Sequence, residues 1–154
     1  MGVTELKEKP ILFSQPMRHK IVMGQKTVTR RLIKPPPEFE KKNGESMWFY
    51  RGAFYPDIEL RKFLAEESKF KPNEILWVKS MLYQSRKEAC FRLRVVSCLP
   101  IRLHEIDDAD AYREGFTNRH EFSAYWDYLH EGKEDRFKWF KNPWVWRIEF
   151  VRLK

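Results

Sequence analysis

The strongest constraint on the fold is the alternation of apolar side chains in PWVWRIEFVRL (143–153). Four large apolar residues share one face of this run when it is extended: Trp144, Trp146, Ile148 and Phe150. Successive side chains of a strand point to opposite faces, so we expect this face to be buried against a core. A second run, CFRLRVVSCL (90–99), alternates in the same way. The chain therefore contains at least two half-buried strands.

A short helix is expected over residues 14–23, because Pro16 suits a first helical turn and Gly24 suits the position just after a last one. The run KTVTRRLI (26–33) follows and is predicted to be a strand. Its basic and threonine residues then lie just beyond the end of a helix.

Two more helices are predicted in the second half of the chain. The first spans 106–116, with Asp107 as its cap and Gly115 as its end. The second spans 118–132, where an asparagine cap precedes a glutamate by three residues. Its apolar stripe is expected to face the core rather than a ligand: Phe122, Tyr125, Trp126 and Leu129.

Residues 35–72 are expected to form an insertion over one face of the core. Three consecutive prolines break regular structure, and Asn43-Gly44 favours a turn. The run MWFYRGAFYPD (47–57) then indicates two short aromatic strands. Together with a further strand over 74–83, these elements predict a mixed α+β domain with a barrel-like sheet and two or three short flanking helices.

Length and charge narrow the function classes. A chain of 154 residues fits a single domain, and a net charge of +8 with 16% aromatic residues fits a polyanionic partner such as nucleic acid. The sequence has neither an apolar run of membrane-spanning length nor a signal-peptide pattern, so we expect a soluble, cytoplasmic protein with no membrane partner. Cys90 and Cys98 are expected to be free thiols, and we predict neither a metal nor a cofactor.

Cations gather around the segment GQKTVTRR (24–31). Phosphates are contacted by cations, and an unstacked base is held against an aromatic face. The residues predicted to contact nucleic acid come from this region and from the strand at 90–99: Arg18, Lys20, Gly24, Lys26, Arg30, Arg31, Arg92 and Arg94. Trp48, Phe49 and Tyr50 are either exposed stacking residues or a local core.

Four blocks in their order and spacing resemble ASCH-domain proteins, in particular the short ones of phages and prophages of enteric bacteria. The blocks are ILFSQPMRHKIVMGQKTVTRRLIKP, ILWVKSMLY, RLRVVSCLPIRLHEIDDADAYREGF and WDYL…NPWVWRIEF. The likeness runs from about Pro10 to Leu153 and is weakest between Pro35 and Pro72. It implies a PUA-like pseudo-barrel, an RNA or nucleoside-like ligand, and a groove lined by the G-x-K-x-x-T-x-R residues of 24–31.

One bacterial branch of the family hydrolyses acetylcytidine, and the resemblance carries its catalytic set to Lys26, Thr29 and Glu114. A threonine hydroxyl would attack the acyl group, with a lysine of lowered pKa as its base. On an ideal strand Lys26 and Thr29 point to opposite faces, so they converge only if the backbone bends after Gly24. The family pattern also places a glutamate where this chain has Ser80, which weakens the enzymatic interpretation.

Simpler interpretations remain open for each of these residues. Lys26 can be a solvated lysine near a helix end or a phosphate contact, Thr29 ordinary strand sequence, and Glu114 a surface acid. Three functions follow as alternatives. The chain binds RNA or a nucleotide, hydrolyses an acylated cytidine or processes RNA, or serves as a phage accessory protein that contacts another protein through an apolar patch at residues 47–55.

Overall fold

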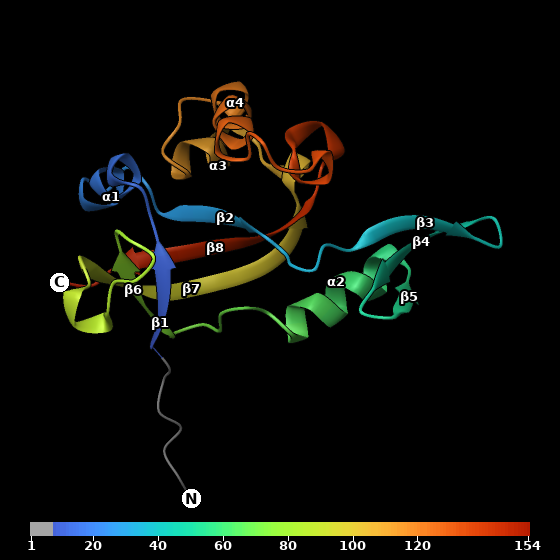
Figure 1. The fold of residues 1–154 in the computed structure, drawn as a ribbon, viewed down its shortest axis with the longest axis horizontal. Coiled ribbons are helices and arrows are strands. Elements are labelled where there is room, and N and C mark those ends of the chain that lie inside the picture. The colour runs from blue at the N-terminus through green and yellow to red at the C-terminus, as the bar shows by residue number, and fades with distance from the viewer. Residues whose placement is uncertain (1–7) are drawn as a thin grey trace, which may run out of the picture.

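A five-stranded sheet forms the centre of the molecule in a computed structural model that describes residues 8–154 (Figure 1). Its strands, in spatial order, are β1 (Glu8–Leu12), β6 (Ile75–Lys79), β7 (Phe91–Arg102), β8 (Trp144–Arg152) and β2 (Val28–Leu32). Neighbouring strands are antiparallel except β1 and β6, which are parallel. The predicted α+β class is confirmed. Within the described residues the sheet is open, because β1 and β2 lie at its two edges and do not pair.

Three helices lie on the same side of this sheet: α1 (Gln15–Val22), α3 (Asp108–Arg113) and α4 (Arg119–Leu129) (Figure 1). The caps predicted for α3 and α4 are confirmed. The side chain of Asp107 accepts from the amide of Asp110 at 2.7 Å, and that of Asn118 accepts from the amide of Glu121 at 2.8 Å. Each cap satisfies an amide that the first helical turn leaves without a partner, so these helices begin where the sequence indicates.

The segment between β2 and β6 forms a second, three-stranded sheet and a helix: β3 (Glu38–Lys42), β4 (Glu45–Tyr50), β5 (Ala53–Tyr55) and α2 (Asp57–Glu66). Asn43 and Gly44 form the predicted turn, both with positive φ. The expectation that the proline-rich segment lacks regular structure up to this turn is wrong for β3, because pairing with β4 supplies its backbone hydrogen bonds. That this unit is an insertion into a single domain stays a prediction.

Trp48 joins the second sheet to the first through an edge-to-face contact with Trp144, at 5.4 Å between ring centroids. Trp48 is 7% exposed and Tyr50 is 4% exposed. The local-core interpretation of these aromatic residues is therefore the correct one for both. Met47, Phe49, Phe54 and Tyr55 stay partly exposed, so the apolar patch expected at residues 47–55 and its contact with another protein stay a prediction.

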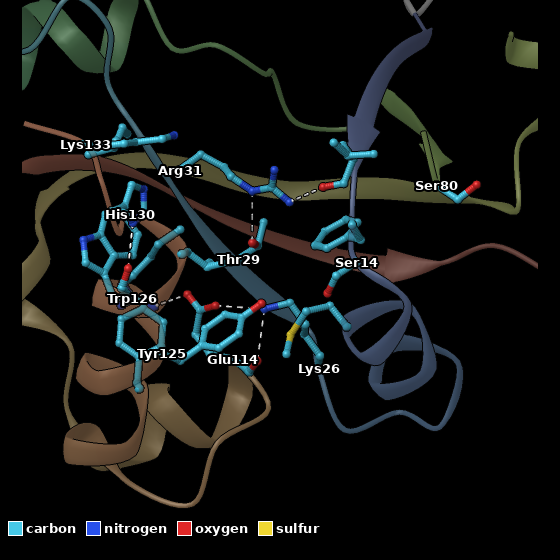
Figure 2. Close-up of a pocket in the computed structure, with 17 residues that line it drawn as sticks. Ser14, Lys26, Thr29, Arg31, Ser80, Glu114, Tyr125, Trp126, His130 and Lys133 are labelled. Carbon is cyan, nitrogen blue, oxygen red and sulfur yellow. Dashed lines mark hydrogen bonds and ion pairs between the residues drawn. The ribbon is translucent and has the colours of Figure 1, made fainter. Parts of the chain in front are cut away.

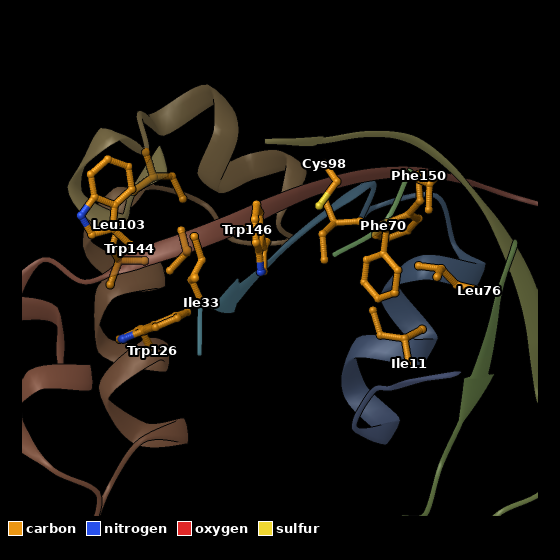
Figure 3. Packing of buried hydrophobic residues seen from close by; sticks show 14 of the residues in the cluster. Ile11, Ile33, Phe70, Leu76, Cys98, Leu103, Trp126, Trp144, Trp146 and Phe150 are labelled. Atoms are coloured by element: carbon orange, nitrogen blue, oxygen red, sulfur yellow. The ribbon is translucent and has the colours of Figure 1, made fainter. Parts of the chain in front are cut away.

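The core lies between the large sheet and its helices, and the predicted apolar face of β8 is buried in it (Figure 3). Phe70, in the connection after α2, packs into the same core beside Ile11 and Leu76 (Figure 3). Cys90 and Cys98 are free thiols, as expected. Within residues 8–154, the helices are too short and too polar to cross a membrane.

Candidate functional site

A pocket of about 460 Å³ lies between β2, the connection from β1 to α1, and α4 (Figure 2). It occupies the seam between the two unpaired edges of the large sheet. Arg31 of β2 reaches across this seam, and its guanidinium donates to the carbonyl of Leu12 on β1 at 2.8 Å. The pocket therefore lies between β1 and β2, the two edge strands that would pair with each other if the sheet closed into a barrel.

The backbone after α1 places Lys26 in this pocket. Gly24 adopts a φ of +77°, which turns the chain out of the helix, and the amide of Lys26 then donates to the carbonyl of Lys20 at 3.2 Å. The strand predicted from residue 26 in fact begins at Val28. Lys26 precedes the strand and escapes its alternation, so Lys26 and Thr29 both line the pocket.

Glu114, at the end of α3, holds the Lys26 ammonium. The ammonium donates to the Glu114 carboxylate at 2.9 Å, to the Glu114 carbonyl at 3.0 Å and to the Val28 carbonyl at 2.9 Å. All three of its donors are thus in use. Lys26 and Glu114 are 4% and 2% exposed. Burial is the main cause that lowers the pKa of Lys26 from 10.5, and the adjacent carboxylate opposes it.

Gly115, just after α3, allows the end of α3 to lie close to the Lys20 side chain of α1. Its φ is +100°, and a Cβ atom at this position would lie 2.9 Å from the side chain of Lys20. The Lys20 ammonium donates to the carbonyl of Gly115 at 2.6 Å. A glycine is needed here both for the backbone conformation and for the space.

The second oxygen of Glu114 accepts from Arg30 at 3.0 Å, and Arg30 also pairs with Asp110, one helical turn earlier on α3. Asp110 accepts two further hydrogen bonds from Arg147 of β8, at 2.7 and 2.8 Å. Burial alone would raise the pKa of Asp110, but the hydrogen bonds from Arg147 and Arg30 outweigh it and hold the pKa well below 3.8. The charges of Lys26 and Arg30 are therefore neutralised inside the protein.

Arg31, the next residue, has a different environment. Its Nε donates to the Thr29 hydroxyl at 3.3 Å, and its guanidinium lies 4.7 Å from the ring centre of Phe13. Within residues 8–154 no carboxylate forms an ion pair with it. Burial lowers the pKa of Arg31 from 12.5, yet a guanidinium stays charged at neutral pH. Arg31 thus brings to the pocket wall a positive charge that is not paired directly with a carboxylate, although Glu114 attracts it from further away.

The aromatic wall of the pocket comes from the apolar stripe of α4, which the sequence assigns to the core. Phe122 and Trp126 are indeed buried in the core, but all four stripe residues also line the pocket, with His130 and Lys133 just beyond them. Sequence reasoning does not identify His130 and Lys133, because neither lies in a recognisable motif. Figure 2 shows Trp126 and His130 facing Thr29 and Arg31.

The other residues predicted to contact nucleic acid do not line the pocket. Arg18 donates to the carbonyl of Phe13 at 2.6 Å, and Lys20 to Gly115 as described above. Arg92 pairs with Glu8 at 3.1 Å, and Arg94 donates to Asn73 at 3.3 Å; both arginines lie on β7, the central strand of the sheet. Their contact with nucleic acid stays a prediction, as does the role of Gly24 beyond its turn.

Comparisons with known proteins bear on the fold. No family model matches the sequence, and no curated protein matches it either. Among solved structures, protein EF3133 from Enterococcus faecalis V583, of the DUF984 family, superposes with a TM-score of 0.56 at 10% identity over 98% of this chain and 83% of its own. The chain has the fold of this DUF984 protein.

An ASCH domain from Lactobacillus crispatus JV V101 is also similar, with a TM-score of 0.49 at 11% identity over 94% of this chain and 79% of its own. ASCH is the family that the sequence resembles. The more specific resemblance to phage and prophage members stays a prediction.

Proposed function

We propose that this protein binds RNA by holding one nucleotide in the pocket at the seam of the large sheet. The observation that carries the proposal is the combination of the α4 aromatic wall with the Arg31 guanidinium, which has no directly paired carboxylate, in one cavity. A volume of about 460 Å³ falls within the range of small-molecule sites. Apolar and aromatic surface suits the base, and a guanidinium suits the phosphate.

The buried ion pairs supply rigidity to this site rather than affinity. The charges of Lys26 and Arg30 are already paired with Glu114 and Asp110, so a ligand gains little by approaching them, although Arg30 Nε has no hydrogen-bond partner within the described residues. They fix the position of β2 against α3, and β2 in turn carries Thr29 and Arg31. A guanidinium that is already placed loses less freedom when it binds a phosphate than an exposed one does.

The test is the affinity of the purified protein for a fluorescently labelled single-stranded oligoribonucleotide, measured by anisotropy at several salt concentrations. Arg31→Met is expected to weaken binding about tenfold or more and to reduce the salt slope by about one phosphate contact. The control is Lys62→Met on α2, which removes an exposed charge outside the pocket. Equal losses in the two variants would indicate a general charge effect and would contradict the proposed site.

A second candidate function, hydrolysis of an acylated cytidine, is favoured by one observation: Lys26, Thr29 and Glu114 line the same pocket. The Thr29 hydroxyl would attack the acyl carbon, its proton would pass to a neutral Lys26, and the C–N bond would break as the amine leaving group takes that proton. Water would then cleave the acyl–threonine ester, releasing the carboxylic acid and restoring the hydroxyl. However, the three acceptors around the Lys26 amine favour its protonated form and so oppose its use as a base. The chain also has Ser80 on the pocket wall where the family pattern has a glutamate.

Turnover of N4-acetylcytidine by the purified protein distinguishes the two functions. Hydrolysis requires release of cytidine, its loss in Thr29→Val and Lys26→Ala, and its persistence at high salt because the substrate is uncharged. Absence of cytidine release by the wild-type protein would remove this candidate and leave nucleotide binding in place.

A further inference from the structure

His130 lies at the C-terminal end of α4, and its imidazole lines the pocket opposite β2 (Figure 2). The ring stacks on Trp126, with centroids 4.3 Å apart and planes inclined by 28°. Its Nδ1 lies 2.7 Å from the carbonyl oxygen of Trp126. Two contacts therefore fix both the plane and the rotation of this imidazole.

The hydrogen bond to Trp126 determines which nitrogen carries the proton. A carbonyl oxygen can only accept, so Nδ1 must donate, and the neutral ring then has an unprotonated Nε2. Within residues 8–154 no side chain or backbone group hydrogen-bonds to Nε2. The pocket wall also holds four cations that can only donate, namely Lys26, Arg30, Arg31 and Lys133, and four hydroxyls that can both donate and accept, those of Ser14, Thr29, Ser80 and Tyr125. The Glu114 carboxylate is already paired with Lys26 and Arg30, so Nε2 of the neutral ring is an unpaired acceptor that cannot also donate.

We propose that Nε2 of His130 accepts a hydrogen bond from an N–H group of the bound nucleobase, and that it selects bases presenting a donor there, such as the exocyclic amine of cytosine or adenine. This inference rests on the proposed nucleotide binding. The base lies against the aromatic surface of α4, and the acceptor reads one position on its edge, as in other single-stranded RNA sites. His130 is thus a specificity-determining residue and takes no part in holding the phosphate.

Several charged groups act on this imidazole. Burial lowers its pKa from 6.5, and Lys133 after α4 and Lys34 after β2 lower it further. The Trp126 carbonyl and Asp127 of α4 oppose them, without reversing the direction. His130 is therefore neutral at pH 7, and acid converts its acceptor into a donor. Binding that depends on the acceptor weakens as the pH falls through the pKa of His130, which lies below 6.5.

The experiment measures dissociation constants of cytidine and adenosine 5′-monophosphates, and of their N4,N4-dimethyl and N6,N6-dimethyl counterparts, by calorimetry. The dimethylated bases lack the amine N–H. The wild-type protein is expected to bind at least one parent nucleotide about tenfold more tightly than its dimethylated counterpart at pH 7.5, since one buried hydrogen bond to an acceptor is lost. This preference should shrink toward pH 5.

Three variants separate the acceptor from the packing. His130→Gln can present an amide oxygen near the position of Nε2, and it should keep the preference for the parent nucleotide while losing its pH dependence. His130→Asn can retain a donor near Nδ1, and His130→Phe can retain the stack on Trp126, but neither provides the acceptor. In both, the parent and dimethylated nucleotides should bind within about twofold of each other.

The outcomes distinguish this inference from the proposed function. Binding of all the nucleotides with equal affinity, or binding that strengthens as the pH falls, would overturn the role of His130 and leave nucleotide binding intact. A dimethyl penalty that persists in His130→Phe would show steric exclusion by another residue and would also overturn it. If the wild-type protein binds neither these nucleotides nor the oligoribonucleotide, both proposals fall together.

Discussion

The pocket has two charged walls, an inner and an outer one, which differ in whether their cations are paired with carboxylates. The inner wall, formed by Lys26, Arg30 and Glu114 with Asp110 behind them, is buried and internally neutralised. The outer wall, formed by Arg31, His130 and Lys133, has no carboxylate partner within the described residues. Arg30 and Arg31 are adjacent in the sequence, yet the acids of α3 and its C-terminal end form direct ion pairs only with Arg30. The difference shows that the charge available to a ligand is set by the neighbouring helix and not by the basic motif itself.

The largest expected effect on stability comes from replacing Arg30 and Arg31 one at a time. Arg30→Met leaves Asp110 and Glu114 buried with fewer cations, and we expect it to lower the free energy of unfolding by about 3–5 kcal/mol. Arg31→Met removes hydrogen bonds to neutral acceptors and should cost only about 1 kcal/mol. Urea denaturation measures both values. Equal destabilisation by the two variants would show that the two walls do not differ in this way.

Acid should reduce the stability that the inner wall contributes to the folded protein, because the wall depends on the ionised carboxylate of Asp110. The pKa of Asp110 is lowered in the folded protein, so its stabilisation is fully present above the unfolded value near 3.8 and is lost as the pH falls below it. We expect the carboxylate to contribute about 2 kcal/mol of stability at neutral pH, which decreases progressively below about pH 4 and is not yet fully lost at about pH 2. Asp110→Asn should flatten this part of the stability curve. Asp135→Asn, at an exposed position, should leave it unchanged.

The close approach of α3 to α1 can be tested at two glycines with positive φ. Gly115→Ala should lower the free energy of unfolding by about 2 kcal/mol or more, because it combines backbone strain with a contact on the Lys20 side chain. Gly132→Ala meets no atom within 4 Å and should cost about 1 kcal/mol from strain alone. A larger loss at Gly132, measured by thermal or urea unfolding, would contradict the packing described for the inner wall.

The smallest effect is expected at the rim of the outer wall. Lys133 is exposed, so Lys133→Met should weaken oligoribonucleotide binding by about twofold to threefold at low salt, and the difference should vanish as salt increases. Anisotropy titrations at two salt concentrations measure it. If Lys133→Met lost as much affinity as Arg31→Met, the main phosphate contact would have to be assigned to Lys133 rather than to Arg31.

Local signals predicted much of the fold. The caps Asp107 and Asn118 and the turn at Gly24 act within a few residues, so the sequence alone reveals them. The strand β3 was not predicted, because it depends on pairing with β4 rather than on its own composition. The open seam was not predicted either, since closure depends on how far the curved sheet brings β1 toward β2.

The candidate site was predicted in part. The resemblance brings Lys26, Thr29 and Glu114 together, and all three do line one pocket, although Lys26 and Glu114 are 88 residues apart. Their catalytic role stays a prediction. The stripe on α4 was assigned wholly to the core because a buried face and a pocket wall have the same apolar pattern. His130 and Lys133 required the three-dimensional arrangement.

The bond from Arg31 to the Leu12 carbonyl has a consequence for β1. This bond tethers β1 to β2, the two edge strands of the sheet, and a phosphate that recruits the same guanidinium competes with that tether. Amide hydrogen exchange along residues 11–13 then becomes a reporter of occupancy, faster when the ligand draws the arginine away and unchanged when it leaves the tether in place.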